Sequence, residues 1–296
     1  MAKTRRIKSS EVDFGVNSLP KNRTSLFFSL LKRRFLLFFG LSLLSILFIG
    51  PAIVFETISR VSIFSDASIE NLNITQVVSY ILFSSLISLA LNFVLCMGFS
   101  GLVHILQNLA HEKIVFVSDF FKGIKENILL SIFFTIFLTL GYSVYKLNYV
   151  FSIDNAQFNM LKSVGFGFSI LLLLTIIIMG FVSFIQNTVY KLNFRSLLTN
   201  SFNFYLKGLL IYALITIVSF FYIFAIIFGS VIVDGILGFL LIILSPEITL
   251  VFVLYTDSKL DKFINKEHYI ICDMPKLINP NYKIKSMPKY SNYIFF

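Results

Sequence analysis

Residues 118–134 read SDFFKGIKENILLSIFF, and they join two kinds of sequence. The first ten residues mix phenylalanines with lysines and acids, whereas the residues from 128 to 145 carry no charge and are mostly apolar. A run of about 18 such residues is close to the length that a helix needs to cross a bilayer. The stretch therefore predicts a helix that enters a membrane directly from a charged, aromatic segment.

The composition of the whole chain supports a membrane protein. Of the 296 residues, 57% are hydrophobic and 14% are charged, and the mean hydropathy is +0.85. A soluble domain carries about 25% charged residues, so lipid must surround much of this chain. The net charge of +10 could instead indicate nucleic-acid binding. We expect no nucleic-acid partner, because the sequence has no basic stripe with a stacking platform.

Six segments are long and apolar enough to be spanning helices. We expect an all-α integral membrane bundle of about six helices in a domain of residues 35–256, preceded by a basic N-terminal segment, 1–34, and followed by a C-terminal tail, 257–296. The first span has a charged leader too long for a cleaved signal peptide, so it is typical of a signal anchor. Residues 1–20 and 275–296 are expected to be poorly ordered. The predicted spans are 35–55, 77–102, 128–145, 164–186, 208–229 and 231–256.

Lysine and arginine are distributed unequally between the two sides of these spans. The N-terminal segment has nine, the loops after the second and fourth spans have three each, and the tail has seven, which places 22 on one side. The other side carries only Arg60, Lys146 and Lys162. Because cytoplasmic loops are enriched in basic residues, both termini are predicted to lie in the cytoplasm, with the spans in the plasma membrane.

Residues 118–127 lie just before the third span on the basic side. Phe120 and Phe121 are expected on one side of a helix and Lys122 and Lys125 on another, as in a helix that lies in the lipid headgroup layer. Each lysine would gain about 1 kcal/mol from an anionic leaflet. An ordinary helix end with snorkelling lysines explains the same pattern equally well.

Two segments indicate an internal repeat. The second span leads into ILQN (105–108) and the fourth into FIQN (184–187), and each is followed by polar and aromatic residues, a lysine and a new span. The second copy continues as FNFYLKGLLIYAL (202–214). Both units enter the cytoplasm in the same direction, so they would be parallel hairpin repeats. The match is short, and chance similarity is the alternative.

The segment GFSGLVHILQNLAHEKIVFVSDFFKGIKENILLSI (98–132) resembles the characteristic segment of the YesL-type family of bacterial multi-span membrane proteins. Residues 50–52 and 193–209 are similar to two other parts of the family pattern. The chain departs from the pattern at Gln107, where the family has arginine, in the outer loop 56–76 and in its long tail. The resemblance implies a small multi-span protein, often an accessory to carbohydrate uptake, without catalytic residues. The matching positions are Gly101, Asn108, Glu112, Asp119, Phe120, Lys125, Glu126 and Asn127.

The sequence contains no legible metal or cofactor site. His104, His111 and His268 are not spaced as a ligand set; the first two would share a helix face, where interfacial histidines are commoner than a cation site. Cys96 lies in a span and Cys272 in the tail, so both are expected to be free thiols. No nucleophile elbow, phosphate loop or dinucleotide fingerprint occurs. We therefore expect no enzymatic activity, cofactor or metal.

Polar side chains inside the spans are the strongest functional candidates, because lipid makes them costly. Glu247 follows Pro246 in LSPEITL, where the proline frees a carbonyl and the acid could help to hold a cation; a solvated or paired position is the alternative. Asn92 fits an interhelical hydrogen bond better than a substrate contact. Asp234 is expected in a solvated turn, and Pro51 is expected to kink the first span near its outer end.

These observations favour a non-enzymatic accessory or regulatory protein whose partners are the lipid bilayer and a membrane transporter, with a carbohydrate transporter implied by the family resemblance. The alternative is a transporter or channel in its own right, which uses Glu247 and the interface between the repeated hairpins. A carrier needs polar groups that face a cavity near the midplane, and the sequence shows few. The accessory hypothesis assigns partner contact to the segment 104–127. Its candidate residues are Asp119, Phe120, Phe121, Lys122 and Lys125.

Overall fold

The computed structural model describes residues 23–65, 74–111, 113–153, 159–190, 192–219 and 231–263. Within these ranges every regular element is an α-helix, which confirms the predicted all-α membrane bundle. By length and composition, four described helices could cross a membrane, or up to six spans if each of two bent pairs is one span. The helices are α1 (Arg23–Arg33), α2 (Phe35–Phe48), α3 (Gly50–Ser65), α4 (Ile74–Ala110), α5 (Val117–Glu126), α6 (Ile128–Ile153), α7 (Asn159–Val189), α8 (Phe194–Ser219), α10 (Val231–Ile243) and α11 (Ser245–Phe263).

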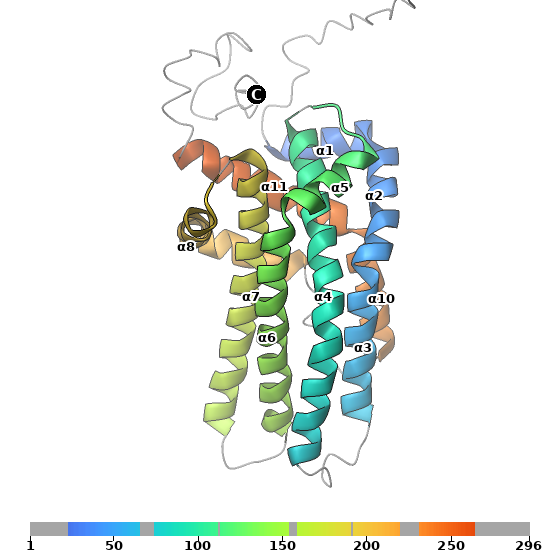
Figure 1. Ribbon diagram of the computed structural model, residues 1–296, viewed down its shortest axis with the longest axis vertical. Coiled ribbons are helices and arrows are strands. Elements are labelled where there is room, and N and C mark those ends of the chain that lie inside the picture. The colour runs from blue at the N-terminus through green and yellow to red at the C-terminus, as the bar shows by residue number, and fades with distance from the viewer. Residues whose placement is uncertain are drawn as a thin grey trace, which may run out of the picture.

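Three long helices, α4, α6 and α7, run side by side along the long axis of the molecule (Figure 1). The 37 residues of α4 would extend about 55 Å, well beyond a hydrocarbon layer of about 30 Å. The helix continues eight residues past its predicted end at 102. His104 and Gln107, which end the apolar run, are buried there, His104 against α5 and Gln107 against α11. The prediction that residues 104–110 belong to a loop is therefore wrong.

The first and last predicted spans are each broken into two helices. The pair α2 and α3 bends by 46° around Ile49, just before Pro51. The pair α10 and α11 bends by 58° around Leu244, just before Pro246. Proline has no backbone N–H and clashes with the preceding turn, so both breaks fall where the sequence interrupts the hydrogen-bond ladder. The predicted kink at Pro51 is confirmed, but it lies within the span and not near its outer end, since α3 continues to residue 65.

The two breaks pack against each other. Ser42 of α2 donates a hydrogen bond of 2.8 Å to the carbonyl of Ile243, the last residue of α10. Ser245 donates one of the same length to the carbonyl of Ile242. Pro246 has no N–H to donate to the Ile242 carbonyl four residues earlier, and the Ile243 carbonyl ends α10. The two serine hydroxyls therefore supply donors to carbonyls at the break.

The fifth predicted span, 208–229, differs most from the structure. The helix α8 begins at Phe194, fourteen residues before the predicted start, and residues 220–230 lie outside the described residues. Figure 1 shows α8 nearly end-on, so it runs across the long axis of the bundle and not along it. Polar contacts attach it to α7. They are the hydrogen bonds Ser183–Ser201 (2.9 Å) and Thr175–Tyr205 (3.0 Å).

The opening stretch forms α5 and the beginning of α6. The Asp119 carboxylate accepts a hydrogen bond of 2.8 Å from the backbone N–H of Phe116, which caps the start of α5. At the other end Asn127 donates to the carbonyl of Gly123 at 2.9 Å and accepts a hydrogen bond from Asn187 of α7, also at 2.9 Å. The chain turns from α5 into α6 at this asparagine, which α7 holds in place.

Glycines allow α5 to lie very close to α4. A Cβ atom added at Gly101 of α4 would lie 2.8 Å from the Phe120 ring, and one at Gly123 of α5 would collide with His104. Phe120 is fully buried in this contact. Small residues at both positions are therefore a condition for docking α5.

The two units of the sequence repeat have different geometries. In the first unit the chain changes helix at Asn127, between α5 and α6. In the second, α8 continues through Lys207 and Gly208 as one helix. Gly208 faces Tyr212 and Tyr255, so its close contact is with α8 itself and with α11.

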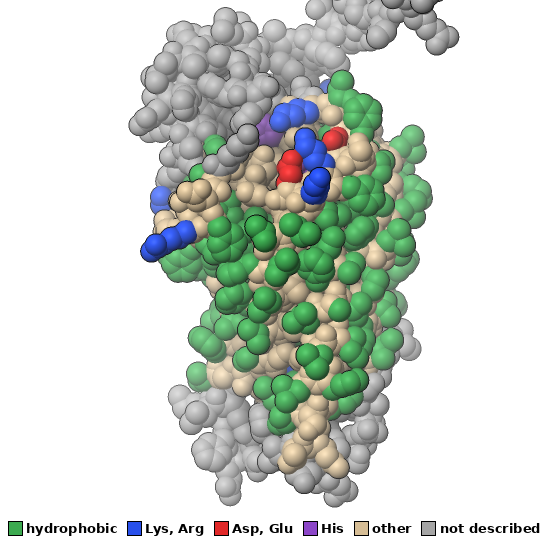
Figure 2. Space-filling view, viewed as in Figure 1, with side chains coloured by type: hydrophobic (Ala, Val, Ile, Leu, Met, Phe, Trp, Pro, Cys, Tyr) green, Lys and Arg blue, Asp and Glu red, His purple; other side chains and the backbone are tan. Residues whose placement is uncertain are grey.

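Hydrophobic side chains cover most of the visible surface, and charged side chains gather at one end, around α5 (Figure 2). The helix α1 and the end of α11 lie at this same end (Figure 1).

Several predictions fall outside the described residues: the poor order of residues 1–20 and 275–296, and the states of His268 and Cys272. The side chain of Asp234 is not described either.

Candidate functional site

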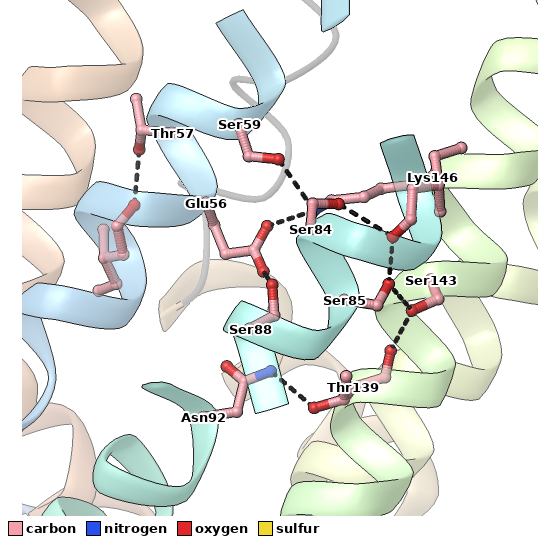
Figure 3. Close-up of polar contacts among 12 residues, drawn as sticks. Glu56, Thr57, Ser59, Ser84, Ser85, Ser88, Asn92, Thr139, Ser143 and Lys146 are labelled. Carbon is pink, nitrogen blue, oxygen red and sulfur yellow. Dashed lines mark hydrogen bonds and ion pairs between the residues drawn. The ribbon is translucent and has the colours of Figure 1, made fainter. Parts of the chain in front are cut away.

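Two opposite charges meet inside the bundle at Glu56 and Lys146 (Figure 3). Glu56 belongs to α3 and Lys146 to α6, and the Lys146 Nζ atom lies 2.7 Å from the Glu56 carboxylate. Their side chains are 13% and 6% exposed, respectively. A charge inside a membrane bundle is costly unless an opposite charge or cavity water compensates it. Each of these residues compensates the other.

Polar groups from three helices surround this ion pair. Ser88 of α4 donates a hydrogen bond to the Glu56 carboxylate, and Lys146 donates one of 3.3 Å to the Ser59 hydroxyl. The Lys146 Nζ atom also lies 4.7 Å from the centre of the Tyr142 ring, within the range of a cation–π interaction. The ion pair therefore joins α3, α4 and α6.

A column of hydroxyl and amide groups leads from the ion pair toward the middle of the bundle (Figure 3). Ser85 and Ser143 share a hydrogen bond of 2.6 Å, and Ser143 donates to the Thr139 carbonyl at 2.7 Å. The Asn92 amide donates to the Thr139 hydroxyl at 3.1 Å. Measured along the axis of α6 from its start at Ile128, Thr139 lies at about 18 Å and Lys146 at about 28 Å. The column thus extends from near the middle of a hydrocarbon layer of about 30 Å to its far edge.

A cavity of about 160 Å³ adjoins this column. Glu56 and Asn92 line it, together with Cys96 and mostly apolar side chains of α3, α4, α6 and α7. Ile49, at the break between α2 and α3, and Leu241, just before the break between α10 and α11, also line it. The cavity therefore adjoins both broken spans and the polar column.

Sequence reasoning missed Glu56 and Lys146, because the apolar windows ended at residues 55 and 145 and both charges were assigned to outer loops. A signal was present in the sequence. Side chains four apart share a helix face, and a polar stripe on a spanning helix faces other helices. The polar residues that recur at this spacing are Ser84, Ser88 and Asn92 on α4, and Thr135, Thr139 and Ser143 on α6.

The intramembrane candidates from the sequence separate in the structure. Asn92 makes the expected interhelical hydrogen bond and also lines the cavity. Glu247 lies in the first turn of α11 and does not line the cavity. Its Oε2 atom is buried and makes no hydrogen bond to any described residue. The N-terminus of α11 favours a negative charge at this position. Cys96 is a buried free thiol, as expected.

The candidates on α5 also divide into two groups. Phe120 is buried between α5 and α4, so it is not available for the partner contact that the sequence hypothesis assigns to it. Asp119 caps the helix, which is a structural role. Phe121 is 53% exposed, and Lys122 and Lys125 are exposed beside it. These three residues are available for contact with headgroups or a partner.

A second buried polar cluster lies at the charged end of the bundle. Asp257 of α11 accepts a hydrogen bond of 2.7 Å from Gln107 and lies 3.6 Å from the His111 ring nitrogen. Arg23 of α1 approaches the same carboxylate at 3.9 Å. The cluster connects α1, α4 and α11. Gln107 is therefore a buried contact to an acid.

The described residues contain no group of three or more His, Cys, Asp or Glu side chains that could hold a metal ion. His104 lies 3.5 Å from Glu126, and His111 belongs to the cluster around Asp257. The two histidines therefore contact different acids on different helices.

No family model, curated protein or solved structure matches this chain. The length and composition of its helices are those of a multi-pass membrane protein. Its function must therefore be inferred from the ion pair, the polar column and the cavity.

Proposed function

We propose that this protein is a membrane transport protein that binds a small solute in the cavity between α3, α4, α6 and α7. The observation that carries the proposal is the position of the cavity, which adjoins the breaks of two discontinuous spans and the inner end of a polar column. Membrane carriers commonly bind their substrates near the midplane, where broken helices expose backbone groups.

The polar groups support this proposal over a purely structural role. A protein that only packs against a partner needs an apolar face and no buried charges. Here Glu56, Lys146 and Asn92 are kept inside the bundle at an energetic cost. Of the two sequence hypotheses, the carrier is the one that requires polar groups at a midplane cavity, although the residues involved differ from the expected Glu247.

The proposed setting is the plasma membrane, with both termini in the cytoplasm. The charge distribution supports this orientation, because 22 of the 25 lysines and arginines belong to one side of the predicted spans. The clustering of α1, α5 and the end of α11 at one end of the bundle agrees with that count (Figure 1). We assign no reaction to the protein.

Cys96 provides a direct test, because it lines the cavity and a Cys272→Ser variant leaves it as the single thiol of the chain. A transport protein must open its cavity to water at least on one side. We expect a charged, membrane-impermeant methanethiosulfonate to modify Cys96 in native membranes from one or both sides, since this reagent needs water and a thiolate.

Two variants in a cysteine-free background control this test. A cysteine at Leu86, which faces outward on the same helix and is 71% exposed, should resist the reagent because lipid surrounds it. A cysteine at the exposed Lys113 should react from the cytoplasmic side. If Cys96 reacts from neither side but reacts fully after denaturation, the cavity does not open to water and the transport proposal fails.

The accessory role is a second proposal, and it rests on the surface beside α5. Ile114, Phe116 and Phe121 are more than half exposed next to exposed lysines at the charged end of the bundle. Crosslinking in native membranes should recover a transporter with the wild-type protein, and less of it with Ile114→Ser/Phe121→Ser. Phe28→Ser, an exposed position on α1, is the matched control. Equal recovery with all three proteins would remove this surface from consideration.

A further inference from the structure

The chemistry of the cavity wall restricts the ligand that it can hold. Most of the lining is apolar, and Glu56 and Asn92 bring polar groups to the wall. Glu56 is already neutralised by Lys146, which does not line the cavity, and also accepts a hydrogen bond from Ser88. A ligand in the cavity therefore meets a compensated ion pair and not a free charge. An ionic ligand would lose its hydration and gain no opposite charge in return.

Asn92 and Tyr142 bring an amide and a hydroxyl group to the cavity wall. The Asn92 amide nitrogen is directed to Thr139 at 3.1 Å, and Figure 3 shows its amide oxygen on the opposite side. The Glu56 carboxylate is already engaged, since its Oε2 atom is buried beside Lys146 and it accepts the hydrogen bond from Ser88. A ligand with one hydroxyl or N–H group, which can donate to the Asn92 oxygen, fits this wall better than a purely apolar ligand.

The size of the cavity sets the size of the ligand. Its volume is about 160 Å³. An apolar protein cavity of about 150 Å³ holds a single benzene molecule. Phe99 and Phe181, whose rings pack edge to face with centroids 5.1 Å apart, form part of the wall. One aromatic ring, or an aliphatic group of similar volume, therefore fills the space.

We propose that the cavity binds a small neutral molecule of about one ring, with one O–H or N–H donor directed to Asn92; phenol has this chemistry. The inference rests on the proposed transport function, because it specifies the solute class for the same cavity. Charged metabolites do not fit, because the ion pair leaves them no opposite charge.

The test is a titration of fluorinated ligands with the purified full chain in lipid nanodiscs. Binding is monitored by ¹⁹F NMR of the ligand. The probes are 4-fluorophenol and 4-fluorotoluene, which have the same shape and differ in the hydroxyl donor. We expect 4-fluorophenol to bind roughly tenfold more tightly, the factor that corresponds to one hydrogen bond of about 1.4 kcal/mol. Asn92→Leu should reduce this preference while 4-fluorotoluene binding persists.

Cavity-filling variants separate the site from unspecific partition into lipid. Ala52→Leu places a larger side chain at the cavity wall, whereas Ala90→Leu makes the same change at an exposed position of α4. Only the first should abolish binding. Gly180→Ala is a milder second variant, since its Cβ would make an ordinary contact of 3.6 Å with Phe134, and it should weaken binding.

Three results would overturn the inference: equal affinity for the two probes, tighter binding of 4-fluorobenzylammonium, or binding that Ala52→Leu and Gly180→Ala leave unchanged. Absence of any binding would overturn it too. These failures are distinct from failure of the transport proposal, because modification of Cys96 by the impermeant reagent is measured without any ligand. A chain whose Cys96 is modified but which ignores 4-fluorophenol would keep the transport proposal and lose this solute class.

Discussion

Removing one partner of the buried ion pair should destabilise the protein strongly, whereas removing both should not. Lys146→Met leaves the Glu56 carboxylate inside the bundle with the hydrogen bond from Ser88 that Figure 3 shows. Glu56→Gln leaves the Lys146 ammonium group beside Ser59 and the Tyr142 ring. In each single variant an uncompensated charge stays buried.

The structure sets the expected size of these effects. Breaking a buried ion pair at one partner typically costs about 3–5 kcal/mol. Lys146 lies near the far edge of the hydrocarbon layer, about 28 Å along α6, where water can approach after a mutation. We therefore expect about 3 kcal/mol for each single variant. The double variant loses the charges together, so its cost should be the lost hydrogen bonds alone, about 1–2 kcal/mol.

The double-mutant cycle is measured by unfolding the purified protein in mixed micelles with increasing fractions of dodecyl sulfate. The chain has no tryptophan, so far-ultraviolet circular dichroism is the appropriate signal. A coupling energy above about 2 kcal/mol is expected. Lys122→Met is the control, because its contact with Glu126 is exposed and should contribute less than about 1 kcal/mol. Single variants that cost less than about 1 kcal/mol and add up in the double variant would refute a buried ion pair.

Two further predictions concern the close contacts of the fold. Gly123→Ala forces a methyl group into His104 and should cost about 1–3 kcal/mol of unfolding free energy, whereas Gly40→Ala, with open space around it, should be neutral; equal effects would show that α5 is not docked as described. Ser42→Ala should cost about 1–3 kcal/mol in the same assay, because it leaves the Ile243 carbonyl at the helix break without the hydroxyl donor of 2.8 Å. A neutral Ser42→Ala would mean that another group satisfies this carbonyl.

The sequence predicted the helical bundle well because lipid imposes a strong rule on it. A spanning segment must satisfy its backbone internally and be apolar over about 20 residues, and the windows at 128–145 and 164–186 fall inside α6 and α7. Boundaries failed where tertiary contacts bury polar residues. His104 and Gln107 end the apolar run of α4, but α5 and α11 cover them and the helix continues.

The orientation of α8 could not be predicted from the sequence. Its 26 residues satisfy the same length and composition criteria as α6, yet it runs across the bundle. Hydropathy measures how apolar a segment is, and both a spanning helix and one packed crosswise against α7 can be equally apolar. The distinguishing contacts, such as Ser183 with Ser201, join residues on different helices. The hydropathy pattern of one helix does not reveal contacts of this kind between helices.

Of the polar residues at the candidate site, the sequence predicted only Asn92. Asn92 was identified because a lone amide inside a span is conspicuous. Glu56 and Lys146 were not, since each lies within a residue of the end of an apolar window, where a charge normally faces water. Their role depends on an ion pair between residues 90 positions apart in the chain, and only the fold brings these residues together.

The role of the two proline breaks also depends on how the fold places them. Each proline separately predicts a kink, and the sequence gives no reason for the kinks to meet. In the structure Ser42 on one broken span bonds the last carbonyl of α10 on the other, and Ile49 and Leu241 beside the two breaks line the same cavity. A change of bend at either break would therefore move the cavity wall directly. Broken helices absorb such changes at few residues, whereas α4 and α6 are continuous and hold Asn92 and Thr139 of the polar column fixed. Glu56 lies on α3 and would move with the broken span, so a change of bend would act on the ion pair with Lys146 as well as on the cavity wall.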